Sequence, residues 1–157
     1  NIMLGGHNQI GNPFLAMLSF PSGRKKEKEL RKKAAEIAEA FGLKDFLDAK
    51  IGSLAYGYKK FAEYARAMVA EPDFLLLDEP AAGCNDEETA EVARMITRIN
   101  KDYGTTILVV EHDMSLVMSV CHRIYVMDSG EIIAEGTPEQ IKRDPKVIQA
   151  YLGDELL

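Results

Sequence analysis

The stretch Phe74-Leu75-Leu76-Leu77-Asp78-Glu79-Pro80 (FLLLDEP) joins four apolar residues directly to two carboxylates and a proline. A short apolar run that ends at a turn signal predicts a buried β-strand. Two adjacent negative charges at the end of such a strand are costly unless something positive lies nearby, because burial disfavours an unpaired charge. We therefore expect a cation to be bound at Asp78 and Glu79.

The residues after this stretch alternate between helix and strand patterns. The predicted strand Phe74–Asp78 is followed by a helix, a second strand and a second helix, at Glu87–Asp102, Thr105–Glu111 and Ser115–Cys121. This order predicts an α/β fold in which a parallel sheet is covered by helices. Ligands bind at the carboxyl ends of the strands in such sheets. We therefore expect Asp78 and Glu79 to meet Glu111 and His112, which follow the second strand, in one crevice.

The residues before the stretch predict helices. A charged segment, Arg24–Phe41, has an apolar stripe at helical spacing and is followed by Gly42, a typical helix stop. Further helices are predicted at Leu43–Ile51 and Tyr56–Ala70, and a short helical piece near Phe14–Leu18 between loops.

The end of the chain predicts a hairpin and two short helices. Strands at Arg123–Asp128 and Glu131–Glu135 are joined by Ser129-Gly130, a two-residue turn signal. Thr137-Pro138-Glu139-Gln140 has the residues of a capped helix start, and Asp144-Pro145 opens a last helix in the same way.

The composition is that of an ordinary globular domain. The 157 residues are 46% hydrophobic and 28% charged, and the net charge is -6. This charge argues against nucleic acid or an anionic membrane surface as the main partner. The sequence contains no apolar run of the roughly 20 residues that a membrane-spanning helix needs, and it does not begin with a secretory signal. Cys84 and Cys121 show no metal-type spacing, and we expect both to be reduced in a cytosolic protein.

Carboxylates after an apolar strand have a specific use in nucleotide hydrolases. One holds Mg²⁺, and an adjacent one positions or deprotonates the attacking water. A histidine opposite could donate to the terminal phosphate. The alternative is that Asp78-Glu79-Pro80 is a solvated strand end and that His112 is an ordinary surface histidine.

Three further motifs surround FLLLDEP at a characteristic spacing. Leu54-Ala55-Tyr56-Gly57-Tyr58 lies one helix upstream, and the stretches Ala82-Gly83-Cys84-Asn85 and Val110-Glu111-His112-Asp113 follow it. Their order resembles the signature motif, Walker B, D-loop and H-loop of an ABC-transporter ATPase. The stretches AAGCNDEET, EHDMSLVMSVCHRI and IAEGTPEQIKRDPKVIQAYLG resemble the ATP-binding subunits of branched-chain amino-acid importers.

The resemblance implies a role for each matching residue. Asp78 becomes the Walker B residue that binds Mg²⁺, Glu79 the catalytic carboxylate and His112 the switch histidine that senses the terminal phosphate. The signature residues Ala55, Tyr56, Gly57 and Tyr58, and Asn85 of the D-loop, become nucleotide-contacting residues. In this family the signature loop lies at a helix N-terminus and faces ATP held by the other subunit of a head-to-tail dimer, where backbone N–H groups favour an anion.

The signature motif departs from the family pattern. Ala55 stands where the usual serine would donate a hydroxyl, and the bulky Tyr58 stands where glutamine is usual. These changes put full catalytic competence in doubt. For Tyr56 and Tyr58, packing against neighbouring helices and contact with phosphate are equally good interpretations. Lys59 and Lys60 could approach the nucleotide, although charges on an exposed helix are usually only solvated.

The sequence does not contain the phosphate-binding loop G-x-x-x-x-G-K-[ST]. Gly6–Pro13 has the glycine spacing, but Asn12 and Pro13 replace the lysine and the hydroxyl residue. We therefore interpret the chain as a P-loop NTPase-like (ABC ATPase) fragment that lacks the Walker A region. It comprises a helical subdomain (14–70), part of the parallel-sheet α/β core (72–136) and C-terminal helices (137–157).

The expected function is that of an ABC-type ATPase subunit of an importer. It would bind ATP and Mg²⁺, with a second ATPase subunit and membrane permeases as partners and no nucleic acid. It would be cytoplasmic and peripheral on the inner face of the membrane, without direct membrane insertion. The alternative is a truncated or decayed interaction module that docks on transporter partners without turning over ATP. An ABC-like DNA-repair ATPase is disfavoured because the sequence has no long coiled coil and no basic surface.

Overall fold

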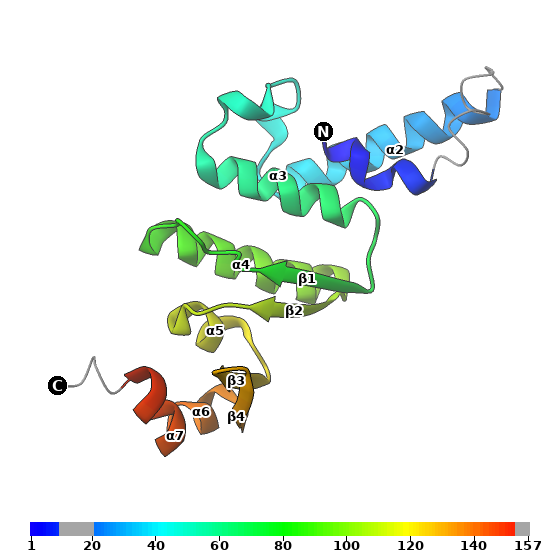
Figure 1. The fold of residues 1–157 in the computed structure, drawn as a ribbon. Helices are drawn as coiled ribbons and strands as arrows, with labels where there is room; N and C mark the ends of the chain where they lie inside the picture. The colour runs from blue at the N-terminus through cyan, green and yellow to red at the C-terminus, as the bar shows by residue number, and fades with distance from the viewer. Residues whose placement is uncertain (10–20, 153–157) are drawn as a thin grey trace. The chain divides into compact units, whose positions relative to one another are not determined.

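The computed structural model describes residues 1–9 and 21–152, so the helical piece expected near Phe14–Leu18 lies outside the described residues. The chain divides into two compact units, which are described separately. The first contains residues 1–75 and 99–107, and the second contains residues 76–98 and 108–157. Figure 1 shows the elements in chain order, from η1 near the N-terminus to α7 near the C-terminus.

The first unit is built around two α-helices, α2 (Pro21–Ala40) and α3 (Tyr56–Met68). The predicted apolar stripe of α2 is buried as expected, and it comprises Leu30, Ala34, Ile37, Ala38 and Phe41. Gly42 follows the helix with φ +70°, a conformation that suits glycine and ends the helix as predicted.

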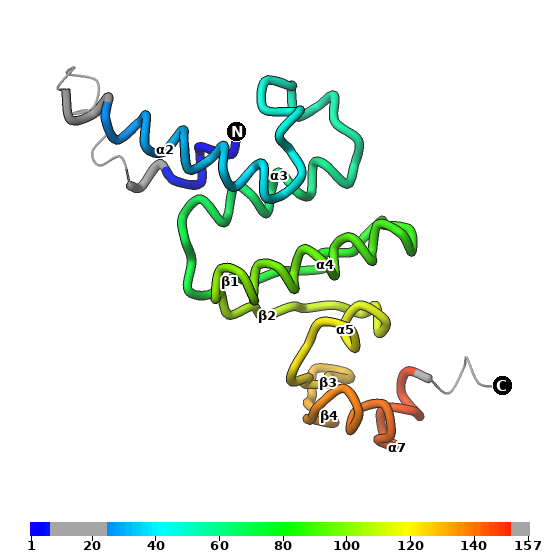
Figure 2. The backbone as a smooth tube through the Cα atoms, turned by 180° about the vertical axis from the view of Figure 1, so that it is seen from behind, coloured from blue at the N-terminus to red at the C-terminus, as the bar shows by residue number. Residues whose placement is uncertain are grey.

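A 3₁₀-helix, η1 (Ile2–Gln9), lies against α2 and α3, as both Figure 1 and Figure 2 show. We expected loops here. Gly5 explains how the segment approaches so closely, since a Cβ atom at this position would lie 1.7 Å from the carbonyl oxygen of Arg66. A Cβ atom on Gly6 would likewise lie 2.3 Å from Cδ1 of Leu30.

The helix predicted for Leu43–Ile51 is wrong. The segment instead contains two single turns of 3₁₀-helix, η2 (Lys44–Phe46) and η3 (Ile51–Ser53). Its backbone bonds span three residues, as in the bond from Phe46 N to Leu43 O. A nine-residue segment is too short to sustain an α-helix without an apolar face to pack, and only Leu43 of this segment is buried.

The strands β1 (Phe74–Asp78) and β2 (Thr106–Val110) pair with each other. Thr106 N donates to Asp73 O at 2.9 Å near the start of both strands, and Glu79 N donates to Val110 O at 2.8 Å after their ends. The two strands therefore run in the same direction, as predicted. The helices α4 (Asp86–Tyr103) and α5 (Met114–Val120) follow them within one residue of the predicted bounds.

The expectation that FLLLD is a fully buried strand is wrong for this structure. Leu77 is buried, but Phe74 and Leu76 are 53% and 63% exposed. Successive side chains of a strand point to opposite faces of the sheet. Leu108 and Val110 of β2 are likewise about half exposed, at 46% and 53%. One face of the two-stranded sheet is therefore open within the described residues.

The second unit also contains a hairpin and short helices. Strands β3 (Ile124–Asp128) and β4 (Glu131–Gly136) pair antiparallel, and Ser129 and Gly130 between them both have positive φ, as the predicted turn requires. Helix α6 (Pro138–Ile141) begins with the predicted capping box of Thr137 and Gln140. It is followed by α7 (Pro145–Val147) and a π-helical turn, η4 (Ile148–Leu152). A hydrophobic cluster joins this part to α5, and its buried residues are Val117 of α5 with Ile124, Val126, Ile141 and Val147.

Among the described residues, none of the helices combines the length and the apolar character that crossing a membrane requires.

Candidate functional site

The carboxyl ends of β1 and β2 place Glu79 next to the segment that begins at Glu111. The bond from Glu79 N to Val110 O extends the strand pairing by one residue, after which the chain turns. Glu79 makes this turn with φ +45°, in the left-handed region that non-glycine residues seldom adopt. The turn directs the chain away from the sheet and leaves the Glu79 side chain 56% exposed.

Glu111 has the opposite environment, because its side chain is 1% exposed. Its carboxylate accepts three backbone N–H bonds, from Ala81 at 2.8 Å, from His112 at 3.0 Å and from Asp113 at 3.3 Å. A buried carboxylate is costly unless it is hydrogen-bonded, and these three donors satisfy that need. Glu111 therefore ties the turn after β1 to the turn after β2.

The sequence reasoning placed Glu111 at the strand end but did not assign this role to it. The pattern that could have indicated this role is a carboxylate that directly follows an apolar strand and precedes a helix cap. It accepts from the N–H groups of turns that have no strand or helix partners.

His112 lies between the two glutamates. Its Nδ1 atom is 3.6 Å from Oε1 of Glu79 and 3.8 Å from Oε2 of Glu111, and its side chain is 75% exposed. The structure therefore brings together Glu79, Glu111 and His112, as the sequence predicted. The meeting of Asp78 with these residues stays a prediction. An exposed carboxylate beside an exposed imidazole can bind a water molecule or a phosphate oxygen from solvent.

Asp78 is the last residue of β1 and is exposed. Among the described residues, no three or more His, Cys, Asp and Glu side chains form a cluster that could hold a metal ion. A strand-end carboxylate such as Asp78 still suits Mg²⁺, which usually takes one or two carboxylates and completes its shell with water and phosphate oxygens.

Asn85 takes part in the start of α4. Its Oδ1 accepts from Glu88 N at 3.0 Å, and Glu88 Oε2 accepts from Asn85 N at 3.0 Å. This is the reciprocal pattern of a capping box. The Asn85 side-chain oxygen, which the resemblance assigned to nucleotide contact, is therefore engaged with its own helix.

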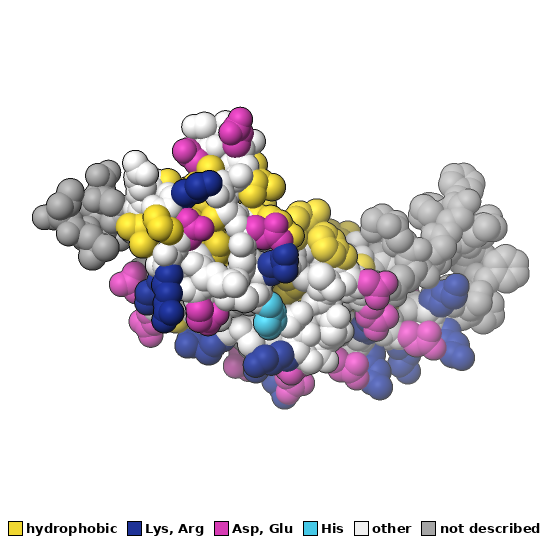
Figure 3. Space-filling view, turned by 90° about the horizontal axis from the view of Figure 1, so that it is seen from below, with side chains coloured by type: hydrophobic (Ala, Val, Ile, Leu, Met, Phe, Trp, Pro, Cys, Tyr) yellow, Lys and Arg dark blue, Asp and Glu magenta, His cyan; other side chains and the backbone are white. Residues whose placement is uncertain are grey.

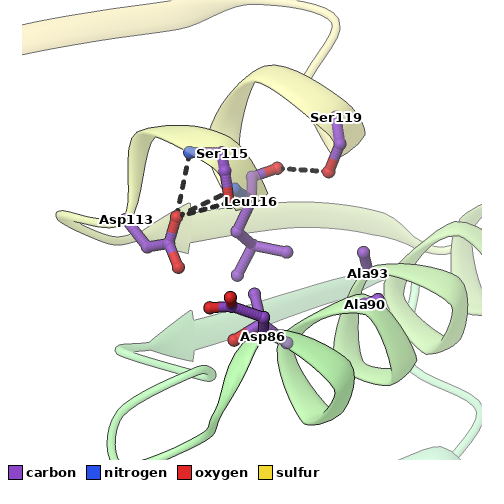
Figure 4. Close-up of a pocket in the computed structure, with 8 residues that line it drawn as sticks. Asp86, Ala90, Ala93, Asp113, Ser115, Leu116 and Ser119 are labelled. Atoms are coloured by element: carbon purple, nitrogen blue, oxygen red, sulfur yellow. Dashed lines mark hydrogen bonds between the residues drawn. The ribbon is translucent and has the colours of Figure 1, made fainter.

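A pocket of about 310 Å³ lies between the first turns of α4 and helix α5. Figure 4 shows that Asp86 and Asp113 face each other across it, with Ala90, Ala93 and Leu116 contributing apolar surface. Asp113 is the N-cap of α5, and its Oδ1 accepts from the N–H groups of Ser115 and Leu116 and from the Ser115 hydroxyl. Partial burial opposes ionisation of Asp113, but these hydrogen bonds outweigh it and lower the pKa of its carboxyl.

The signature residues lie at the start of α3. Ala55 is the N-cap and makes no side-chain bond to the helix, so the first N–H groups of α3 have no capping side chain from this residue. A Cβ atom built on Gly57 meets nothing within 4 Å. Packing within the described residues therefore does not explain a glycine at this position.

The two tyrosines of the signature differ in their surroundings. The Tyr58 ring lies 4.6 Å from the Phe46 ring and 6.4 Å from the Phe61 ring, between centroids. Tyr56 is 48% exposed, and the Lys60 Nζ atom lies 5.4 Å from its ring centroid. The Tyr58 ring is therefore packed on aromatic neighbours. Contact of either tyrosine with phosphate stays a prediction.

The chain is similar to known ABC-transporter proteins. A family model for ABC transporters matches residues 7–82, and one for the branched-chain amino acid ATP-binding cassette transporter matches residues 131–156. The high-affinity branched-chain amino acid transport ATP-binding protein LivG of Escherichia coli (strain K12) is 43% identical over 155 residues, which are 98% of this chain and 61% of LivG. BraF of Pseudomonas aeruginosa, which has the same description, is 41% identical with the same coverage. The chain thus spans about 61% of the length of these curated relatives.

Solved structures agree with these matches. An ATP-binding cassette of an ABC transporter in its ADP conformation has a TM-score of 0.76 at 30% identity, over 97% of this chain and 61% of that one. A nucleotide-free ATP-binding cassette gives 0.74 at 32% identity, over 96% and 60%. An inward-facing ABC transporter of the metal-chelate type gives 0.80 over 97% and 56%, and at 16% identity it supports the fold alone.

The chain has the α/β fold of the ABC ATPases, and its sequence is similar to relatives of this family over 155 residues. It belongs to the family of ABC-transporter ATP-binding subunits and is similar, within that family, to the branched-chain amino-acid transport ATPases.

Proposed function

We propose that this chain is part of the ATP-binding subunit of an ABC importer for branched-chain amino acids. The protein would couple hydrolysis of MgATP, at the interface of a head-to-tail dimer, to transport. The observation that carries the hydrolytic part is the pairing of exposed Glu79 with His112, 3.6 Å apart, on turns that buried Glu111 holds. The substrate part is supported by similarity to LivG and BraF.

Glu79 is the catalytic carboxylate in this proposal. Its exposed side chain can accept a proton from a water molecule that attacks the terminal phosphate, and its fixed backbone limits where that water lies. His112 donates to an oxygen of the same phosphate and so reports whether the phosphate is present. Asp78 holds Mg²⁺, which neutralises charge on the phosphates when it is bound.

The start of α3 provides the second half of a nucleotide site. The Ala55 side chain does not accept from the first N–H groups of α3, and these groups and the positive end of the helix favour an anion. Gly57 leaves space for a phosphate to approach the backbone, since a side chain at this position would have nothing to pack against within the described residues. We assign Ala55, Tyr56, Gly57 and Tyr58 to ATP held by a second ATPase subunit, with Tyr58 contributing its backbone N–H group rather than its ring, and Asn85 to the adjacent D-loop.

The proposal also assigns the regions of the chain and its partners. Residues 14–70 are assigned to the helical subdomain, residues 72–136 to part of the α/β core and residues 137–157 to the C-terminal helices, and of these ranges residues 14–20 and 153–157 lie outside the described residues. The partners are a second ATPase subunit and the membrane permeases. The subunit would be peripheral on the cytoplasmic face of the membrane.

A second function is favoured by one observation. Tyr58, which stands where the family usually has glutamine, is packed on Phe46, and Ala55 provides no hydroxyl. A signature with fewer polar donors suits a module that binds transporter partners without turning over ATP.

Reconstitution of the protein with its permeases in vesicles tests both functions. ATP-dependent uptake of labelled leucine, isoleucine or valine supports the first proposal. ATP hydrolysis without uptake of any of the three overturns the assigned substrate. Stable binding to the permeases without hydrolysis supports the non-catalytic module.

A further inference from the structure

The N-terminal half of α2 carries a concentration of positive charge that the nucleotide site does not explain. Residues 25–33 contain six basic and two acidic side chains, a local net charge of +4, whereas the whole chain has a net charge of -6. Basic side chains gather along this helix, with acidic ones among them, in the right-hand part of Figure 3. The positive charge is therefore local, and the negative net charge of the whole chain does not reveal it.

The basic side chains are arranged by the helix. Leu30, Ala34 and Ile37 are buried and define the core-facing side of α2. Residues three and seven positions apart share one face of an α-helix, which places Lys25, Lys28 and Lys32 together on the opposite side. All three are exposed, and we refer to them as the basic stripe. The stripe extends for about 10 Å along the helix, at 1.5 Å per residue.

The charge of the basic stripe is not neutralised within the described residues. Lys25 and Lys28 form no ion pair there, and Lys32 forms only a solvent-exposed pair with Glu36 at 3.6 Å. Lys33 provides a contrast, since its side chain is 23% exposed and lies 2.8 Å from Glu71. Exposed pairs such as Lys32–Glu36 hold their partners weakly. The stripe is thus available to an external anion.

We propose that the basic stripe of α2 adsorbs on an anionic phospholipid surface. A line of ammonium groups at the tips of flexible side chains fits a plane of negative headgroups, which requires no fixed hydrogen-bond geometry. The stripe contains no apolar side chain, so the contact is electrostatic and does not insert into the bilayer. This contact is additional to any permease contact in the proposed function and does not depend on it.

A nucleic acid fits the same surface less well. The remainder of the chain has a net charge of -10, and a long polyanion that follows the protein surface would meet it. A planar membrane meets only the side of the helix that faces it. Acidic residues elsewhere on the protein repel it little, because charges beyond a Debye length of about 8 Å are screened at physiological salt. Glu29 is exposed on the same side within the stripe, so three lysines face one carboxylate there, whereas Glu36 and Glu39 are exposed near the end of α2. The excess of positive charge, and with it adsorption, is therefore confined to the N-terminal half of the helix.

The test is co-sedimentation of the purified full-length protein with phosphatidylglycerol–phosphatidylcholine vesicles and with pure phosphatidylcholine vesicles. Binding is expected only to the anionic vesicles, and it should disappear as salt approaches about 1 M, where the Debye length is about 3 Å. The variant Lys25→Gln/Lys28→Gln/Lys32→Gln should bind about 100-fold more weakly, at about fivefold per lysine. Glutamine is a good helix former, so the helix should persist, which circular dichroism checks.

The matched control is Lys101→Gln/Lys142→Gln/Lys146→Gln, which removes the same charge from exposed positions elsewhere. It should keep most of the binding. Equal binding to neutral vesicles, an equal loss in the control, or no loss in the stripe variant would each overturn the proposal. Tighter binding of the stripe to double-stranded DNA than to the anionic vesicles would overturn the choice of a membrane.

Discussion

The strand-end region around Glu79 and the start of α3 around Tyr58 both match motifs of the same ATPase family, but their side chains are held differently. In the strand-end region, a buried carboxylate, that of Glu111, accepts three N–H bonds and fixes two turns. At the start of α3, the Tyr58 ring packs on Phe46 and Phe61, and the side chain of the N-cap residue Ala55 accepts no hydrogen bond from the helix. A polar network can fix a turn and leave a neighbouring carboxylate reactive in solvent. An aromatic contact fixes the helix start without providing donors for an anion.

The largest expected effect is a loss of ATP hydrolysis, without a loss of stability, when the strand-end region is altered. Glu79→Gln keeps the size of the side chain but removes the base, so ATP hydrolysis by the full-length protein should fall by about 10²- to 10⁴-fold. ATP binding and stability should be retained, because Glu79 is exposed. Steady-state hydrolysis and ATP titration measure the two effects, with Glu131→Gln as the exposed control. Near-normal turnover would remove Glu79 from the catalytic role.

Glu111→Gln should act on stability rather than on the chemical step. An amide has a single oxygen acceptor, and its NH₂ group would face backbone donors, so at least one buried N–H group loses its partner. We expect a loss of about 1–3 kcal/mol in the free energy of unfolding, measured by urea denaturation. If Glu111→Gln were as stable as the parent, the network would not be what holds the two turns.

The aromatic contact at α3 should have a smaller effect. Tyr58→Gln loses the ring contacts and should cost about 1–2 kcal/mol of stability, whereas Tyr58→Phe keeps the rings and should cost only a few tenths. A double-mutant cycle with Phe46→Leu should give a coupling energy of about 0.5–1.5 kcal/mol. If Tyr58→Phe lowered ATP affinity as much as Tyr58→Gln, the hydroxyl would be a ligand and the contrast between the regions would fail.

The smallest expected effect concerns the cap of α5. Asp113→Ala should cost about 1 kcal/mol of stability by removing the N-cap acceptor. The lowered pKa of Asp113 means that its contribution is complete above about pH 3.9, the ordinary carboxyl value, and is lost as pH falls through the lower pKa of the folded state. Asp113→Asn caps without titrating, so this acid-range decline should disappear when unfolding is measured across pH.

The sequence predicted most elements because their signals are local. The strand Phe74–Asp78 and the capping box at Thr137 depend on neighbouring residues, and both are present. The helix predicted for residues 43–51 was wrong because only Leu43 of this segment is buried, and so short a helix needs a packed apolar face. The packing of η1 depends on the approach of Gly5 to Arg66, 61 positions away, which no local pattern contains.

In the candidate site, too, local patterns predicted some features, and the others depend on tertiary contacts. The sequence predicted that Glu79 and His112 would meet, because strand ends of a parallel pair share one edge. It could not predict that Glu111 is buried while Glu79 is exposed, since that depends on which N–H groups the turns direct inward. The packing of Tyr58 depends on the tertiary position of Phe46 and was therefore left open.

Because of the left-handed backbone at Glu79, the residue that is best for stability differs from the residue that the proposed function needs. A non-glycine residue pays about 1–2 kcal/mol for this conformation, which glycine adopts freely and asparagine tolerates better than most residues. A library randomised at position 79 and selected only for thermal resistance should therefore enrich glycine and asparagine and deplete valine and isoleucine. Selection for growth on the transported nutrient should instead return glutamate. Selection for stability alone would therefore disfavour the residue to which the proposed function assigns turnover.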